Sequence, residues 1–143
     1  MYEAPTAKML NAESGFWNAP RAKLIFVCVT IVWATAILSH LGLILTKNVE
    51  LHPQELFLYI FFGSPVLVAI YVGVKERVYP YRVTLITSFA WSAISFLIAL
   101  MSSESAVAIQ AGVILAFVKE GIFYAAFLVL VALVAHKLAS RLG

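Results

Sequence analysis

The sequence predicts an all-α integral membrane protein with four transmembrane helices in a bundle, and three observations predict this fold. Of its 143 residues, 63% are hydrophobic and only 12% are charged, with a mean hydropathy of +0.97. Soluble domains are about 45–50% apolar and about 25% charged. The apolar residues form runs long enough to cross a bilayer as helices, and the basic residues stand mainly at the ends of these runs. A single domain is expected at this length.

The chain divides into a short leader and a membrane domain. Residues 1–23 are expected to form a cytoplasmic or interfacial leader, and residues 24–143 the four-span membrane domain. Asn18 to Arg21 is typical of a helix start, because proline is favoured in a first turn. Pro53 marks a second start, and Pro65 predicts a kink because it cannot donate to the carbonyl of Phe61. The spans are expected at about residues 24–46, 56–74, 83–101 and 118–136.

The distribution of lysine and arginine predicts the orientation. Cytoplasmic segments of membrane proteins carry an excess of these residues. Four spans with both termini cytoplasmic satisfy this rule in every segment, whereas five spans would place the basic tail outside. We expect the inner (cytoplasmic) membrane of a bacterium. The basic residues counted are Lys8, Arg21 and Lys23 in the leader, Lys47 in the first loop, Lys75, Arg77 and Arg82 in the second, and Lys137 and Arg141 in the tail.

The last apolar run, residues 106–135, is longer than one upright span requires. It is interrupted only by Gln110 and the pair Lys119 and Glu120. If His136 marks the inner interface, the sixteen residues back to Glu120 correspond to about 24 Å of helix. The two charges are therefore expected at the outer boundary or in a protein contact. Residues 106–117 would form an extra apolar segment before the last span, interfacial, re-entrant or a helix extension, with a break or bend near residues 119–121.

A stripe of hydroxyl residues follows one face of the third span. Thr84, Ser88, Ser92 and Ser95 are spaced by four, four and three residues, which places them on the same side of a helix. Such a stripe could line a polar pore, but small residues more often allow membrane helices to approach closely. We expect a helix-packing seam, matched on the last span by Gly121 and Ala125.

Lys119, Glu120 and His40 form the candidate intramembrane polar site. Neighbours on a helix point about 100° apart, so Lys119 and Glu120 do not pair well with each other. The functional interpretation is an ion or proton pathway, and the alternative is an interfacial break before the last span. His40, in the first span, is expected to bond a neighbour such as Ser39 or to meet Glu120.

The sequence contains no pattern typical of a soluble enzyme. The single cysteine, Cys28, can form neither an internal disulfide nor a thiolate metal site, and we expect it to pack in the interior. The glycines form no phosphate-binding loop, and there is no Gly-x-Ser-x-Gly elbow. No metal site and no catalytic residue are predicted, and no cofactor is identified.

These observations predict a non-catalytic helical membrane subunit that packs into a larger membrane complex or self-associates. Its expected partners are membrane lipids and other membrane subunits or further copies of the chain. Nucleic acid is not expected, because the basic residues mark topology and contact anionic headgroups. The alternative is a small oligomeric transporter or channel that uses Lys119 and Glu120. A membrane enzyme acting on lipid, with Glu120 or His40 as base, lacks a nucleophile or metal set.

Overall fold

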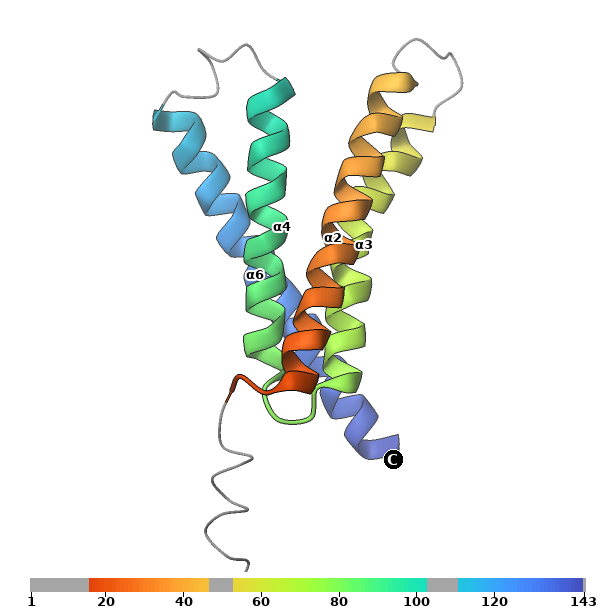
Figure 1. Ribbon diagram of the computed structural model, residues 1–143. Coiled ribbons are helices and arrows are strands. Elements are labelled where there is room, and N and C mark those ends of the chain that lie inside the picture. The colour runs from red at the N-terminus through yellow and green to blue at the C-terminus, as the bar shows by residue number, and fades with distance from the viewer. Residues whose placement is uncertain (1–15, 47–52, 103–110, 143) are drawn as a thin grey trace, which may run out of the picture.

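The computed structural model describes residues 16–46, 53–102 and 111–142, and within these ranges it consists of four long helices and no strand (Figure 1). All four are long and apolar enough to span a membrane, which confirms the all-α, four-span prediction. The expected spans lie within the observed helices, apart from Thr46, the C-cap of α2. The helices are α2 (Ala19–Leu45), α3 (Pro53–Lys75), α4 (Pro80–Ser102) and α6 (Ala111–Leu142).

Local sequence explains where α2 and α3 begin. The side chain of Asn18 caps α2 by accepting a hydrogen bond of 3.0 Å from the backbone N–H of Arg21, and a proline occupies the first turn. Helix α3 begins at Pro53 and carries Glu55 in its first turn, where a negative charge is favourable. Both predicted starts are confirmed. Helix α3 then continues through Pro65 as one helix.

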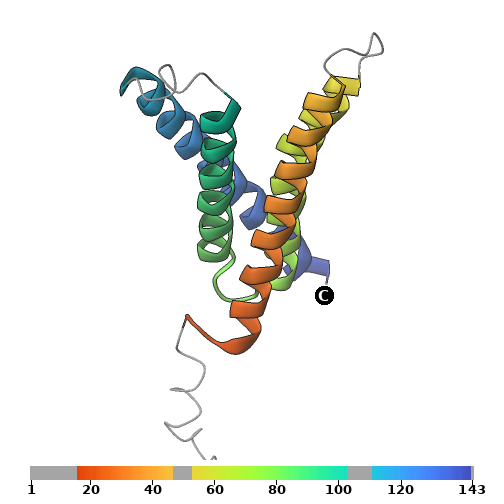
Figure 2. The ribbon, with the colours of Figure 1, turned by 45° about the horizontal axis from the view of Figure 1, so that its top comes forward.

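Helix α6 is one continuous helix of 32 residues, so it has no break at residues 119–121, and residues 111–117 extend the last span as a helix. Backbone groups in a bilayer must be satisfied internally, which favours an unbroken helix. At 1.5 Å per residue α6 is about 48 Å long, against a hydrocarbon thickness of about 30 Å. Figures 1 and 2 show that α6 runs obliquely across the other helices. Residues 106–110 of the expected extra segment lie outside the described residues.

The four helices alternate in direction, so Ala19 and Leu142 lie at the same end of the bundle (Figure 1). The helices converge at this end, and toward the other end α4 and α6 diverge from α2 and α3 (Figure 2). In the described part of the chain, α2 and α6 each contact both α3 and α4 but do not contact each other. Helices α3 and α4 therefore separate α2 from α6.

Two buried apolar clusters hold the helices together. Cys28 lies in the larger one, fully buried against valines, which agrees with a packing role. In the smaller one the backbones of α3 and α6 approach each other closely at Gly73. A Cβ at this position would overlap with the carbonyl oxygen of Ala132. The larger cluster contains Ile25, Cys28, Val32, Val68, Val72, Val83 and Trp91, and the smaller contains Ala69, Leu128 and Ala132.

Hydrogen bonds between helices reinforce this packing near the middle of the spans. Such bonds stabilise membrane bundles because a polar side chain has few other partners in hydrocarbon. Between α2 and α4, Trp33 Nε1 donates to the Ala90 carbonyl (2.8 Å). Between α2 and α3, the hydroxyls of Thr35 and Ser64 lie 2.8 Å apart. Between α6 and α3, the Tyr124 hydroxyl donates to the Phe62 carbonyl.

Candidate functional site

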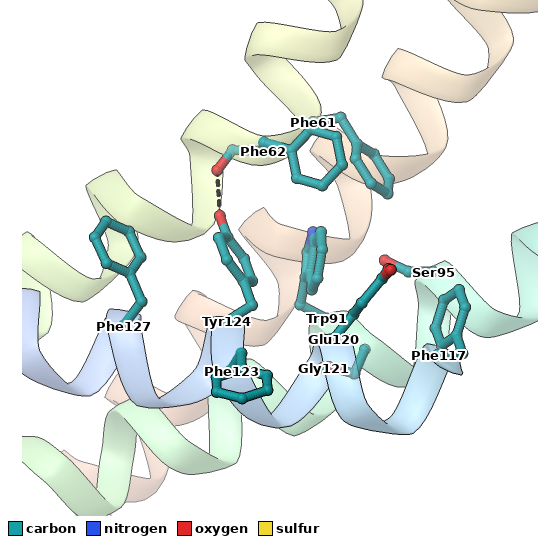
Figure 3. Close-up of a pocket in the computed structure, with 11 residues that line it drawn as sticks. Phe61, Phe62, Trp91, Ser95, Phe117, Glu120, Gly121, Phe123, Tyr124 and Phe127 are labelled. Atoms are coloured by element: carbon teal, nitrogen blue, oxygen red, sulfur yellow. Dashed lines mark hydrogen bonds between the residues drawn. The ribbon is translucent and has the colours of Figure 1, made fainter. Parts of the chain in front are cut away.

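A cavity of about 550 Å³ lies between α3, α4 and α6 (Figure 3). Its walls are mostly aromatic, and Glu120 is the only acidic or basic residue in them. The remaining polar side chains are small hydroxyls and one tyrosine. The lining residues are Phe61, Phe62, Trp91, Ser92, Ser95, Phe117, Glu120, Gly121, Phe123, Tyr124 and Phe127.

Trp91 is the centre of the aromatic wall. Its ring centroid lies 4.7 Å from that of Tyr124, 5.3 Å from that of Phe61 and 5.9 Å from that of Phe62. These separations fall in the range in which aromatic rings attract one another. The hydroxyl of Tyr124 is held by the carbonyl of Phe62. The rings therefore brace one another across three helices and form a pre-shaped wall.

The cavity lies near mid-height in the bundle. A Cβ on Gly121 would lie 3.4 Å from Ser92 Oγ, so these two residues face each other. Ser92 stands twelve residues from the start of α4 and ten from its end. Glu120, the neighbour of Gly121, thus lies near the middle of the bundle and lines a cavity in the protein, while its depth in a membrane stays a prediction. The depth expected from the sequence assumed an upright helix. An inclined helix such as α6 rises less along the bundle axis for the same number of residues.

The hydroxyl stripe of α4 faces the protein, but its hydrogen bonds stay largely within its own helix. Thr84, Ser88 and Ser95 are buried, and Ser92 is half-buried. The Thr84 hydroxyl donates to the carbonyl of Pro80 (2.8 Å), and the Ser88 hydroxyl donates to the carbonyl of Thr84 (2.7 Å). On α6, Gly121 faces Ser92 and Ala125 is buried. The residues of the expected seam thus lie where α4 meets its neighbours.

Two hydrogen-bonding groups in the cavity wall are not satisfied by the chain. Among the described residues, three buried side-chain polar atoms have no hydrogen-bond partner: Ser39 Oγ, Trp91 Nε1 and Ser95 Oγ. Two of the three belong to residues that line the cavity. A buried polar group without a partner costs about 1–3 kcal/mol. The wall therefore combines an apolar surface with unused hydrogen-bonding capacity.

The other members of the candidate polar site do not join Glu120. Lys119 is exposed on α6 and is not part of the cavity lining. This is expected, because Lys119 and Glu120 are adjacent on a helix and their side chains point in different directions. His40 is half-buried on α2, a helix that does not contact α6 in the described part of the chain. A meeting of His40 with Glu120 is not among the contacts described here and stays a prediction. Glu120 instead lines the cavity together with aromatic and hydroxyl residues.

A second cluster, missed by the sequence analysis, lies at the end where the helices converge. Arg21 and Glu76 form a buried ion pair, with side chains 6% and 8% exposed. The Arg21 guanidinium also donates to the carbonyl of Phe16 and lies over the Phe16 and Tyr79 rings, 4.9 Å from the latter centroid. Arg82 lies over the same Tyr79 ring at 4.9 Å. We call these five residues the Arg21 cluster.

The charge of Glu76 is stabilised in this cluster. Burial by itself would raise the pKa of Glu76, but the hydrogen bond from Arg21 and those from the backbone N–H groups of Tyr79 and Val78 together lower it below its ordinary value of 4.5. The signal in the sequence was that Glu76 is the only acid in a loop of basic residues. An acid in that position requires a cationic partner, and the pairing with Arg21, 55 positions away, depends on the fold.

No group of three or more histidine, cysteine, aspartate or glutamate side chains is placed to hold a metal ion in the residues that the structure describes. Comparisons with known proteins add no assignment. No protein-family model matches the chain, and no curated protein and no solved structure shows significant similarity to it.

Proposed function

We propose that the protein is a non-catalytic helical membrane subunit that packs through α6 into a larger membrane complex or onto further copies of itself. The observation that carries this proposal is the position of Lys119, a cation exposed at about mid-height on the helix least covered by the rest of the chain. This observation has two parts, namely the depth of Lys119 in the bundle and the small share of α6 that the other helices bury.

The coverage of α6 differs from that of the other helices. Only 17% of the residues in its apolar window are buried within the chain, against 28% for α2 and 33% for both α3 and α4. Helix α6 is also the longest of the four described helices, at 32 residues. Lipid can cover an apolar face, so exposure alone does not require a partner. The charge of Lys119 on that face is the feature that calls for a partner.

Lys119 adjoins Glu120 and Gly121, and the latter faces Ser92 near the middle of α4. A charged side chain near the bilayer centre costs about 2.5–3.5 kcal/mol or more. Lysines escape this cost by snorkelling mainly near helix ends. Lys119 makes no ion pair within the described part of the chain. A partner helix that supplies an acceptor or a carboxylate would offset the cost.

Copurification tests this proposal. The full-length protein, extracted in a mild detergent, is expected to migrate as an assembly larger than one chain, and mass spectrometry identifies its components. Lys119→Leu is expected to weaken the assembly at least ten-fold, whereas Lys137→Leu, a matched control in the basic tail, leaves it intact. A wild-type protein that remains monomeric in several mild detergents contradicts the proposal.

A small oligomeric transporter or channel is the second candidate, favoured by the position of Glu120 in a mid-height cavity. Ionisable residues at such depth commonly belong to ion or proton pathways. If the subunit proposal holds, Glu120→Gln leaves ion flux in reconstituted vesicles unchanged. Flux that disappears in Glu120→Gln, with the assembly intact, supports the transporter instead.

For the orientation we propose that the convergent end of the bundle faces the cytoplasm of a bacterium, across its inner membrane. The described basic residues support this because most lie in the segments at that end, as the positive-inside rule requires. A cysteine at position 141 in a Cys28→Ser background is expected to react with a membrane-impermeant label only from the cytoplasmic side. The residues concerned are Arg21, Lys23, Lys75, Arg77, Arg82, Lys137 and Arg141.

A further inference from the structure

We infer that the cavity between α3, α4 and α6 binds a lipophilic organic cation, a positively charged nitrogen or phosphorus centre that carries apolar groups. This inference goes beyond the proposed role as a subunit, since it concerns a ligand bound between helices of one chain. Four features of the cavity support it: its charge, its aromatic walls, its unsatisfied hydrogen-bonding groups and its size.

The charge of the cavity selects a cation. Glu120 is its only charged lining residue, and no ion pair to Glu120 exists within the described residues. The side chain extends from α6 toward α4, as Figure 3 shows. A carboxylate in apolar surroundings is costly without a counter-charge. A cationic ligand supplies that counter-charge, whereas an anionic ligand would be repelled.

The aromatic walls select an organic cation over a metal ion. Trp91, Tyr124 and Phe62 present rings whose electron-rich faces attract cations, and such cages are used to bind quaternary ammonium groups. Hard metal ions prefer several oxygen ligands, and one carboxylate with two serines is a poor set. The apolar substituents of an organic cation can instead pack against the phenylalanines.

The unsatisfied polar atoms are an independent indication of a ligand. Trp91 is 6% exposed and Ser95 is 7% exposed. The indole N–H of Trp91 and the hydroxyl of Ser95 have no hydrogen-bond partner among the described residues. Both residues line the cavity beside Glu120. Both atoms are themselves fully buried, so a ligand that accepts a hydrogen bond from either requires a small shift of the cavity wall.

The size of the cavity fits this class of ligand. Its volume of about 550 Å³ lies within the range of about 300–1,000 Å³ typical of small-molecule sites. Gly121 and Ser92 keep the space open, because neither carries a large side chain. A bulky substitution at this level of α4 would consequently occupy the space of the ligand.

Equilibrium binding of radiolabelled tetraphenylphosphonium to the full-length protein in mild detergent tests the inference. Wild-type protein is expected to bind it saturably. Glu120→Gln is expected to bind at least ten-fold more weakly. Glu55→Gln is the matched control, because Glu55 is an exposed carboxylate in the first turn of α3, away from the cavity. Neutral triphenylphosphine oxide is expected not to compete.

Ser95→Leu provides a second variant, which keeps the carboxylate but fills part of the cavity, and it is also expected to lose binding at least ten-fold. Circular dichroism and gel filtration establish that each variant is folded. The inference is overturned if folded wild-type protein shows no saturable binding, if folded Glu120→Gln binds as well as wild type, or if the neutral compound competes equally. Assembly is measured separately on Lys119→Leu, so failure of the subunit proposal leaves this test unaffected.

Discussion

Arg21 and Glu76 meet at two points: Arg21 Nε lies 3.0 Å from Glu76 Oε2, and Arg21 Nη2 lies 3.1 Å from Glu76 Oε1. This forked arrangement is the strong form of an arginine–carboxylate pair, because two parallel hydrogen bonds add to the charge attraction. It joins the first turn of α2 to the residue that follows α3. The pair therefore locks the end of the bundle where the helices converge.

Removal of one partner of this pair is expected to destabilise the protein. Glu76→Ala leaves the buried guanidinium of Arg21 without its counter-charge, a change that typically costs about 3–5 kcal/mol. Thermal unfolding in detergent should therefore show a clear drop in Tm. Glu55→Ala, at an exposed acid on α3, serves as the control. A double variant, Arg21→Met with Glu76→Leu, should recover part of the lost Tm. An equal Tm for Glu76→Ala and wild type would contradict a stabilising role for the Arg21–Glu76 pair.

The Arg21–Glu76 pair also predicts acid sensitivity. The folded-state pKa of Glu76 lies below its ordinary value of 4.5. Stability from its ionised form is therefore fully present above about pH 4.5 and is lost as the pH falls through the folded pKa. The Tm of wild type should fall between pH 5 and pH 3 more steeply than that of Glu76→Gln, which cannot titrate there. Parallel curves would show that Glu76 is not the group responsible.

Two glycines of α3 are expected to respond in opposite ways to the same substitution. A Cβ on Gly73 would overlap with the carbonyl oxygen of Ala132 and lie 2.9 Å from the Cβ of Ala135, whereas a Cβ on Gly63 would meet nothing within 4 Å. Gly73→Ala should therefore cost about 1–3 kcal/mol through overpacking. Gly63→Ala should stabilise by up to about 1 kcal/mol, because alanine favours the helix. Thermal unfolding of both variants in one detergent checks the sign of each change.

Substitution of Ser92 tests the contact between α4 and α6. Ser92→Leu places a branched side chain opposite Gly121, and we expect it to push the two helices apart and lower the Tm. Leu97→Phe is the control on the same helix, because Leu97 is 50% exposed. A distance between spin labels at positions 89 and 118, measured by electron resonance, should increase in Ser92→Leu only. An unchanged distance and Tm would mean that the contact is misplaced.

The sequence by itself determined the number of helices, the starts of α2 and α3, and the common apolar character of all four helices. A bilayer admits only segments whose backbone groups are satisfied internally, so an apolar run of sufficient length becomes a helix whatever its neighbours are. The starts of α2 and α3 follow from local chemistry, namely the Asn18 cap and the early prolines. The continuity of α6 through Lys119 and Glu120 was only one of the alternatives that the sequence left open, because two charges resemble an interfacial break when the surrounding helices are not considered.

Only the tertiary structure decided which faces meet and at what depth. A helix that is apolar on every side has no distinct inward face, so its periodicity does not say which residues it buries. The depth of Glu120 depends on the inclination of α6, and the pairing of Arg21 with Glu76 depends on contact between the first turn of α2 and the end of α3. The cavity requires residues of three helices at once. These relations join residues far apart in the chain, and they arise only when the helices pack.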